Sequence, residues 1–164
     1  MTRSALRWRL AAAAVAIGLA AFVFVLVYFQ PQDLLINQTV NQGRPTQAMV
    51  IRQGSFRSGE HHTTGTVHLL ALRDGSTTLR LAPFHTSNGP AVHVWLSEAA
   101  PDASDSTIAN SPHADLGGLK GNIGDQNYAV PRTAGSTRYR TVVIWCERFS
   151  VTFGYAPLTE PAHH

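Results

Sequence analysis

One side chain in this chain of 164 residues could do redox chemistry, the lone thiol of Cys146 in the run 142–149. With no second cysteine, it is a packed core side chain, an intermolecular link, or a group kept for its reactivity. Strict strand alternation puts Cys146 on the more polar face of this run, beside Arg148, where the cation would favour the thiolate. A bulge at Cys146-Glu147 would instead turn the thiol into the core. The sequence leaves these alternatives open.

His93 is the histidine best placed to act with this thiol. It is expected inside a strand, where it alternates out of the face formed by Val92, Val94 and Leu96. Thiolate and imidazole are both axial ligands of haem iron, so haem is a candidate cofactor with Cys146 and His93 as candidate ligands. The plainer alternative is a half-exposed sheet histidine.

Other motifs point away from metal and hydrolytic chemistry. The adjacent pairs His61-His62 and His163-His164 would point in opposite directions along an extended chain, so they make poor chelates. No Cys-x-x-Cys-His motif and no zinc-type spacing occurs, which excludes a covalent c-type haem. No nucleophile elbow surrounds any serine. We therefore expect no metal site, and the sequence does not decide whether the protein is an enzyme.

A membrane anchor is predicted near the N-terminus. Residues 10–29 form an uncharged apolar run, and a helix of about 20 such residues spans the hydrocarbon core of a bilayer. Arg3, Arg7 and Arg9 precede it, which predicts a cytoplasmic N-terminus and an extracytoplasmic C-terminal part. The run is too long for a signal peptide and ends without a small-x-small cleavage site. We expect an uncleaved, single-pass anchor in the plasma membrane.

The basic character of the chain reflects this orientation signal. The net charge of +3 equals the charge of the three arginines before the apolar run, so the exported part is formally neutral. A neutral domain lacks the electrostatic footprint of a nucleic-acid-binding protein. We expect no nucleic-acid partner.

The sequence divides into five regions. Residues 1–9 are a cytoplasmic stub, 10–29 the membrane helix, 30–48 a polar stalk rich in Gln and Asn, 49–158 one folded domain, and 159–164 a tail. Within 49–158, short β-branched and aromatic runs alternate with turn residues. The dipeptide Asp74-Gly75 indicates a tight hairpin. The segment from Ser97 to Asp115 is too polar and broken for a core element. The pattern predicts an all-β, antiparallel sandwich or barrel of about seven to eight strands.

A series of short motifs runs in order through the folded region. They are Gly54-Ser55-Phe56, Gly65, Leu79-Arg80-Leu81, Phe84, Asn88-Gly89-Pro90, His93-Val94-Trp95-Leu96-Ser97, Leu116-Gly117-Gly118-Leu119-Lys120-Gly121, Gly124-Asp125-Gln126-Asn127-Tyr128, Pro131, Val143-Ile144-Trp145-Cys146, Phe149 and Phe153-Gly154. In this order they resemble the DM-thirteen domain, the family labelled electron-transfer DM. One departure is Pro83, where family members often carry an acidic residue, so a site that uses that carboxylate does not carry over.

The resemblance implies a β-sandwich-like domain on the extracytoplasmic side, with a redox role. It also implies that the cysteine matching Cys146 acts as a bare thiol or ligates a prosthetic group such as haem. The function expected is therefore envelope electron transfer, with an envelope redox or protein partner. The alternative is a non-enzymatic binding or structural module in which Cys146 is only packed. Thiol reactivity and a copurifying chromophore would distinguish the two.

Overall fold

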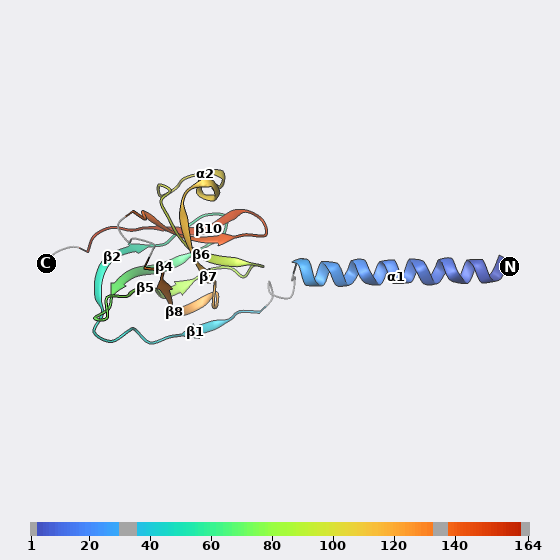
Figure 1. Cartoon of the computed structure of the whole chain (residues 1–164), viewed down its shortest axis with the longest axis horizontal. Coiled ribbons are helices and arrows are strands. Elements are labelled where there is room, and N and C mark those ends of the chain that lie inside the picture. The colour runs from blue at the N-terminus through green and yellow to red at the C-terminus, as the bar shows by residue number, and fades with distance from the viewer. Residues whose placement is uncertain (1–2, 30–35, 133–137, 162–164) are drawn as a thin grey trace.

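A computed structural model of the chain describes residues 3–29, 36–132 and 138–161 (Figure 1). A long N-terminal helix projects from one end of a β-rich domain. The elements, in chain order, are α1 (Arg3–Phe29), β1 (Thr39–Asn41), β2 (Met49–Ser55), β3 (Arg57–Ser58), β4 (Thr64–Ala71), β5 (Thr77–His85), β6 (Val92–Ser97), α2 (Asp105–Asn110), β7 (His113–Gly118), β8 (Ile123–Val130), β9 (Thr141–Cys146) and β10 (Val151–Pro157).

The helix α1 carries the one segment of the described residues that is long and apolar enough to cross a membrane. This segment runs from Arg7 to Tyr28, and none of its most apolar window is buried against the rest of the protein. Length and composition therefore agree with the expected anchor. A helix of this kind near an N-terminus also fits a signal sequence, so the side and the membrane stay a prediction.

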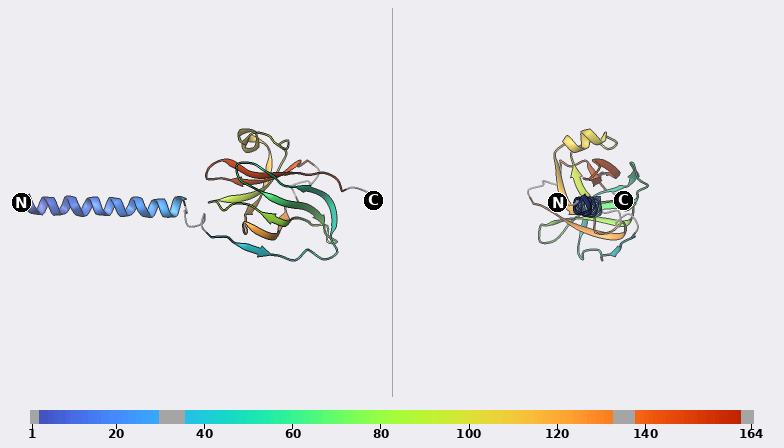
Figure 2. Two further views of the ribbon diagram at one scale, coloured as in Figure 1. Left: turned by 180° about the vertical axis from the view of Figure 1, so that it is seen from behind. Right: turned by 90° about the vertical axis from the view of Figure 1, so that its right-hand side faces the viewer.

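The strands form two five-stranded sheets that pack as a sandwich (Figure 2). The first sheet has the spatial order β1-β8-β5-β4-β2, and the second has the order β3-β10-β9-β6-β7. All neighbouring strands are antiparallel except β1 and β8, which pair in parallel. The all-β prediction is confirmed. Ten strands exceed the expected seven to eight because β1 and β3, of three and two residues, are too short to leave a pattern.

The hairpin between β4 and β5 forms where the sequence predicted it. Gly75 takes a left-handed φ of 77°, and the carboxylate of Asp74 accepts a hydrogen bond from the backbone N–H of Ser76 at 2.9 Å. These are the demands of a tight turn, which Asp and Gly meet at low cost. Leu79 and Leu81 share the inner face of β5 and are fully buried.

The polar segment 97–115 is more ordered than we expected. Ser104 caps the N-terminus of α2 by accepting a hydrogen bond from the backbone N–H of Thr107, and β7 follows the helix. Ile108 is the buried anchor of α2, and it packs with Ala99 and both domain tryptophans in a cluster separate from the main core. Figure 2 shows α2 on the outside of the sandwich. One apolar residue in a six-residue helix is too weak a signal for sequence periodicity to find.

The C-terminal part of the expected stalk lies on the domain. β1 runs beside β8, and the backbone N–H of Gln42 donates to the carbonyl oxygen of Asp125 at 2.9 Å. At Gly121 and Gly124 an added Cβ would lie 2.5 Å and 2.1 Å from the backbone of Gln38 and Val40, so this docking needs glycine at both places. The polar composition of 30–48 concealed this edge strand.

Candidate functional site

Cys146 is the last residue of β9 and is fully buried between the two sheets. It belongs to the main core cluster together with Val142 and Ile144. Its Sγ–H donates a hydrogen bond to the carbonyl oxygen of Pro90 at 3.3 Å. The thiol is therefore in an apolar site with one polar contact.

The interpretation of Cys146 as a residue of the more polar face is wrong. Every residue of β9 is buried, because Val143 and Trp145 on the other face are covered by the cluster around α2. With both faces apolar, alternation could not reveal which face meets the opposite sheet. The strand also ends at Cys146, so Glu147 and Arg148 belong to a turn that leads to β10.

A cavity of about 340 Å³ lies beside the segment that accepts the hydrogen bond of this thiol. Gly89 and Ala91 both line it, and between them Pro90 accepts the hydrogen bond of the thiol. Ala91 has a left-handed φ of 50°, a conformation that costs an L-residue about 1–2 kcal/mol. The opposite wall includes Ile36 and Gln38, from the segment that precedes β1.

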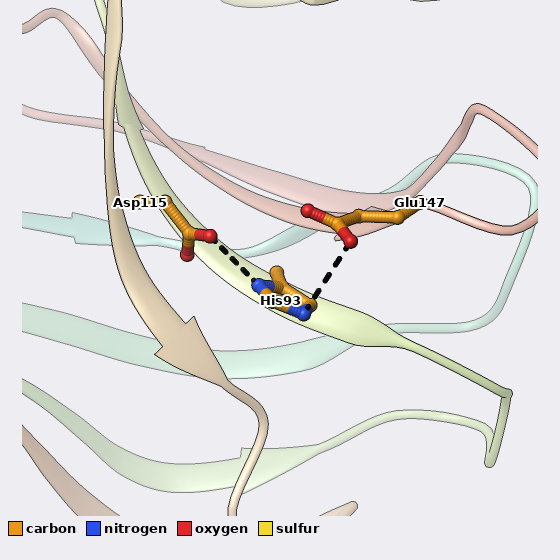
Figure 3. A group of neighbouring side chains, drawn as sticks. All are labelled: His93, Asp115 and Glu147. Carbon is orange, nitrogen blue, oxygen red and sulfur yellow. Dashed lines mark hydrogen bonds and ion pairs between the residues drawn. The ribbon is translucent and has the colours of Figure 1, made fainter.

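His93 lies on the outer face of β6, as its alternation with Val92, Val94 and Leu96 predicted. Its Nδ1 is 2.8 Å from Oδ2 of Asp115, and its Nε2 is 3.7 Å from Oε2 of Glu147 (Figure 3). The side chain is 24% exposed, and the two carboxylates flank the ring in Figure 3. A hydrogen bond from the backbone N–H of Gly117 to Oδ1 of Asp115, at 2.8 Å, fixes that carboxylate.

Cys146 and His93 lie on opposite faces of the second sheet, so their side chains do not meet at one group. In the register of β6 and β9, Cys146 pairs with Val92 while His93 pairs with Trp145. Cys146 and Val92 therefore share the inner face, and His93 projects from the outer face of the same sheet. A haem held by both side chains does not fit this arrangement, and the thiol itself does not line the cavity.

The outer face also carries a row of stacked rings. Trp95 stacks on His113, with ring centroids 4.0 Å apart, and on Trp145, with centroids 4.9 Å apart. The sequence pattern indicated no partner for His113. His113 and Trp95 meet because β7 pairs with β6. His61 lies far along the chain from these residues and packs on Phe153 instead.

Sequence reasoning missed the grouping of His93 with Asp115 and Glu147. The three residues come from β6, from β7 and from the turn after β9, and no spacing along the chain relates them. The available signal was weak. Glu147 is an acidic residue directly after a buried strand, and Asp115 lies two residues before the glycine pair 117–118.

These features define a class of protein: a two-sheet β-sandwich behind a single apolar helix, with one core thiol beside a small cavity. A family model described as electron transfer DM13 matches residues 55–158, which is most of the chain. The chain belongs to this family. No curated protein and no solved structure matches it.

Proposed function

We propose that this protein is a membrane-anchored electron-transfer protein whose β-domain lies on the extracytoplasmic side. The description of the family as an electron-transfer family supports the redox role. The segment from Arg7 to Tyr28 serves as the anchor, and the arginines before it favour a cytoplasmic N-terminus. The partner would be an envelope protein or small molecule with which the domain exchanges reducing equivalents.

Cys146 is the redox group in this proposal, and it acts as a bare thiol. The observation that supports this assignment is the hydrogen bond from Sγ to the carbonyl of Pro90, whose two neighbours, Gly89 and Ala91, line the cavity. A movement of residues 89–91 would open the thiol to the cavity. The thiolate could then attack a disulfide, forming a mixed disulfide while the second sulfur leaves as a thiolate and the cysteine proton passes to solvent.

A second candidate function is a binding module in which Cys146 is only packed. The complete burial of the thiol favours this reading, because free cysteine is a common small core side chain. In that case the cavity beside residues 89–93 would be the binding site and the thiol would have no chemistry.

The reactivity of Cys146 in the native state distinguishes the two. The full-length chain in detergent micelles would be mixed with excess aromatic disulfide reagent over a series of low urea concentrations. If residues 89–91 open locally, labelling should be faster than global unfolding and nearly independent of urea, since local opening exposes little surface. A labelling rate with the full urea dependence of global unfolding would mean that the thiol is only packed.

Two glycine variants provide a matched pair. Ala91→Gly removes the cost of the left-handed residue in the closed wall, so it should stabilise the closed form by about 1 kcal/mol and slow labelling about fivefold. Gln47→Gly relieves a similar φ of 56° at an exposed position outside the wall and should leave the labelling rate unchanged. An absorption spectrum with added haemin, compared with Cys146→Ser, tests the haem alternative in the same samples.

A further inference from the structure

The outer face of the second sheet brings three metal-ligating side chains together. One ligand atom from each of His93, Asp115 and Glu147 lies within 4.8 Å of the others (Figure 3). Each residue comes from a different part of the chain, and the pairing of β6 with β7 and β9 fixes their relative positions. The His93 side chain lies on the opposite face of the sheet from Cys146, although His93 also lines the cavity beside residues 89–92.

The two ring nitrogens of His93 have different surroundings. Nδ1 is within hydrogen-bond distance of Asp115, and this carboxylate is itself fixed by the N–H of Gly117. A carboxylate that accepts the Nδ1–H of a histidine sets the tautomer and turns the Nε2 lone pair outward, an arrangement typical of metal-binding histidines.

The distance between Nε2 and the nearest oxygen of Glu147 suits two ligands of one ion. At 3.7 Å it is too long for a hydrogen bond. Two ligands bound to one transition-metal ion at about 2.1 Å each, with a tetrahedral angle between them, are about 3.4 Å apart. A small rotation of the exposed Glu147 side chain would reach that separation.

The charge of the group also favours a cation. Within residues 36–132 and 138–161, neither Asp115 nor Glu147 forms an ion pair with an arginine or lysine. Two carboxylates therefore share one imidazole, which leaves a net negative charge whether or not His93 is protonated. A divalent ion would neutralise it.

We propose that His93 and Glu147 bind a divalent first-row transition-metal ion on the outer face of the second sheet, with Asp115 as the residue that positions the imidazole. A ligand set of one imidazole nitrogen and one carboxylate oxygen suits zinc, copper or iron better than calcium or magnesium. Solvent completes the coordination, since His93 is partly exposed and both carboxylates are exposed.

The proposal can be tested by titrating the full-length chain in detergent with Zn²⁺ and recording the heat of binding by calorimetry. Cu²⁺ would then report nitrogen coordination through its electron paramagnetic resonance spectrum. One equivalent bound by the parent protein should be lost in His93→Gln and in Glu147→Gln. Asp115→Asn should weaken it roughly 10- to 100-fold, as expected for a positioning residue.

Two controls keep the assignment specific. His113→Gln removes an exposed histidine of the neighbouring strand, and Glu98→Gln removes a carboxylate that pairs with Arg138 instead. Both control variants should bind the metal like the parent. Any binding elsewhere in the chain, such as at the terminal histidine pair, should be the same in every variant. Thermal melts would show that each variant is folded. Equal stoichiometry and affinity in the parent and in folded His93→Gln would overturn the proposal.

Discussion

At the scale of single residues, Tyr128 links the stability of the domain to pH. Its hydroxyl donates to Oε1 of Gln126 at 2.8 Å and accepts the backbone N–H of Lys120 at 3.0 Å. The side chain is almost completely buried, and this burial raises the pKa of Tyr128 to about 12. The phenol is thus kept neutral in the folded state well beyond the range in which an unfolded tyrosine ionises.

Alkaline pH should therefore destabilise the domain through Tyr128. The pKa is near 10 in the unfolded chain and about 12 in the folded one, so between these values the unfolded state binds fewer protons. The stabilisation is fully present below pH 10 and is lost as the pH rises to 12, up to about 2–3 kcal/mol. Urea unfolding at pH 8, 10 and 11 would measure it. Tyr128→Phe should flatten this dependence, and an equally steep loss in that variant would contradict the assignment.

Residue patterns alone located one candidate site residue correctly and misplaced another. The outward position of His93 follows from its place between Val92 and Val94, because β6 has one apolar inner face. The same logic failed at Cys146, because its strand is apolar on both faces. The partners of His93 could not be predicted, since cross-strand register decides them and register is not encoded by local spacing.

At the scale of elements, Arg80 joins two strands of the first sheet, β5 and β8, to the segment that follows β1. Its side chain is almost buried and its guanidinium donates to the carbonyl of Gln42 at 2.8 Å, to Oδ1 of Asn127 at 3.0 Å and to Oδ2 of Asp125 at 2.5 Å. It reaches from β5 across β8 to the chain that leaves β1. The arginine therefore holds the start of the domain against the sheet.

Replacing Arg80 should cost stability at this edge. Arg80→Met keeps the aliphatic stem but leaves three acceptors without their donor, and we expect a loss of about 2–3 kcal/mol, moderated because Asp125 is partly exposed. Urea unfolding would measure this loss of stability. Arg57→Met, at an exposed arginine of β3, is the control. A change below about 0.5 kcal/mol in Arg80→Met would show that Arg80 does not hold this edge of the sheet.

The larger elements were easier to predict than the small ones. The long helix, the β4–β5 hairpin and strands β4, β5, β6 and β9 have clear hydrophobic patterns or turn signals. The short elements β1, β3 and α2 form only because the rest of the domain offers a surface, so local sequence could not reveal them. Which strands belong to which of the two sheets likewise depends on tertiary packing.

At the scale of the whole molecule, the proposed orientation can be tested by labelling from outside the cell. Cys146 is buried, so a new surface cysteine can be read separately with a bulky, impermeant maleimide. Ser106→Cys, on exposed α2, should react in intact bacterial cells, whereas Ser4→Cys, before the apolar run, should react only after lysis. The parent chain is the control for background labelling. The reverse pattern would contradict the orientation derived from the arginines.

The docking of β1 has a consequence for how far this domain can reach. Because the chain is already on the domain by Ile36, only residues 30–35 separate that point from the end of α1. Seven peptide steps cover at most about 25 Å, much less than a free segment up to residue 48 could. If α1 is embedded in a bilayer, the short connection holds the domain close to the lipid surface. Its encounters then become a two-dimensional search that favours partners anchored in the same membrane.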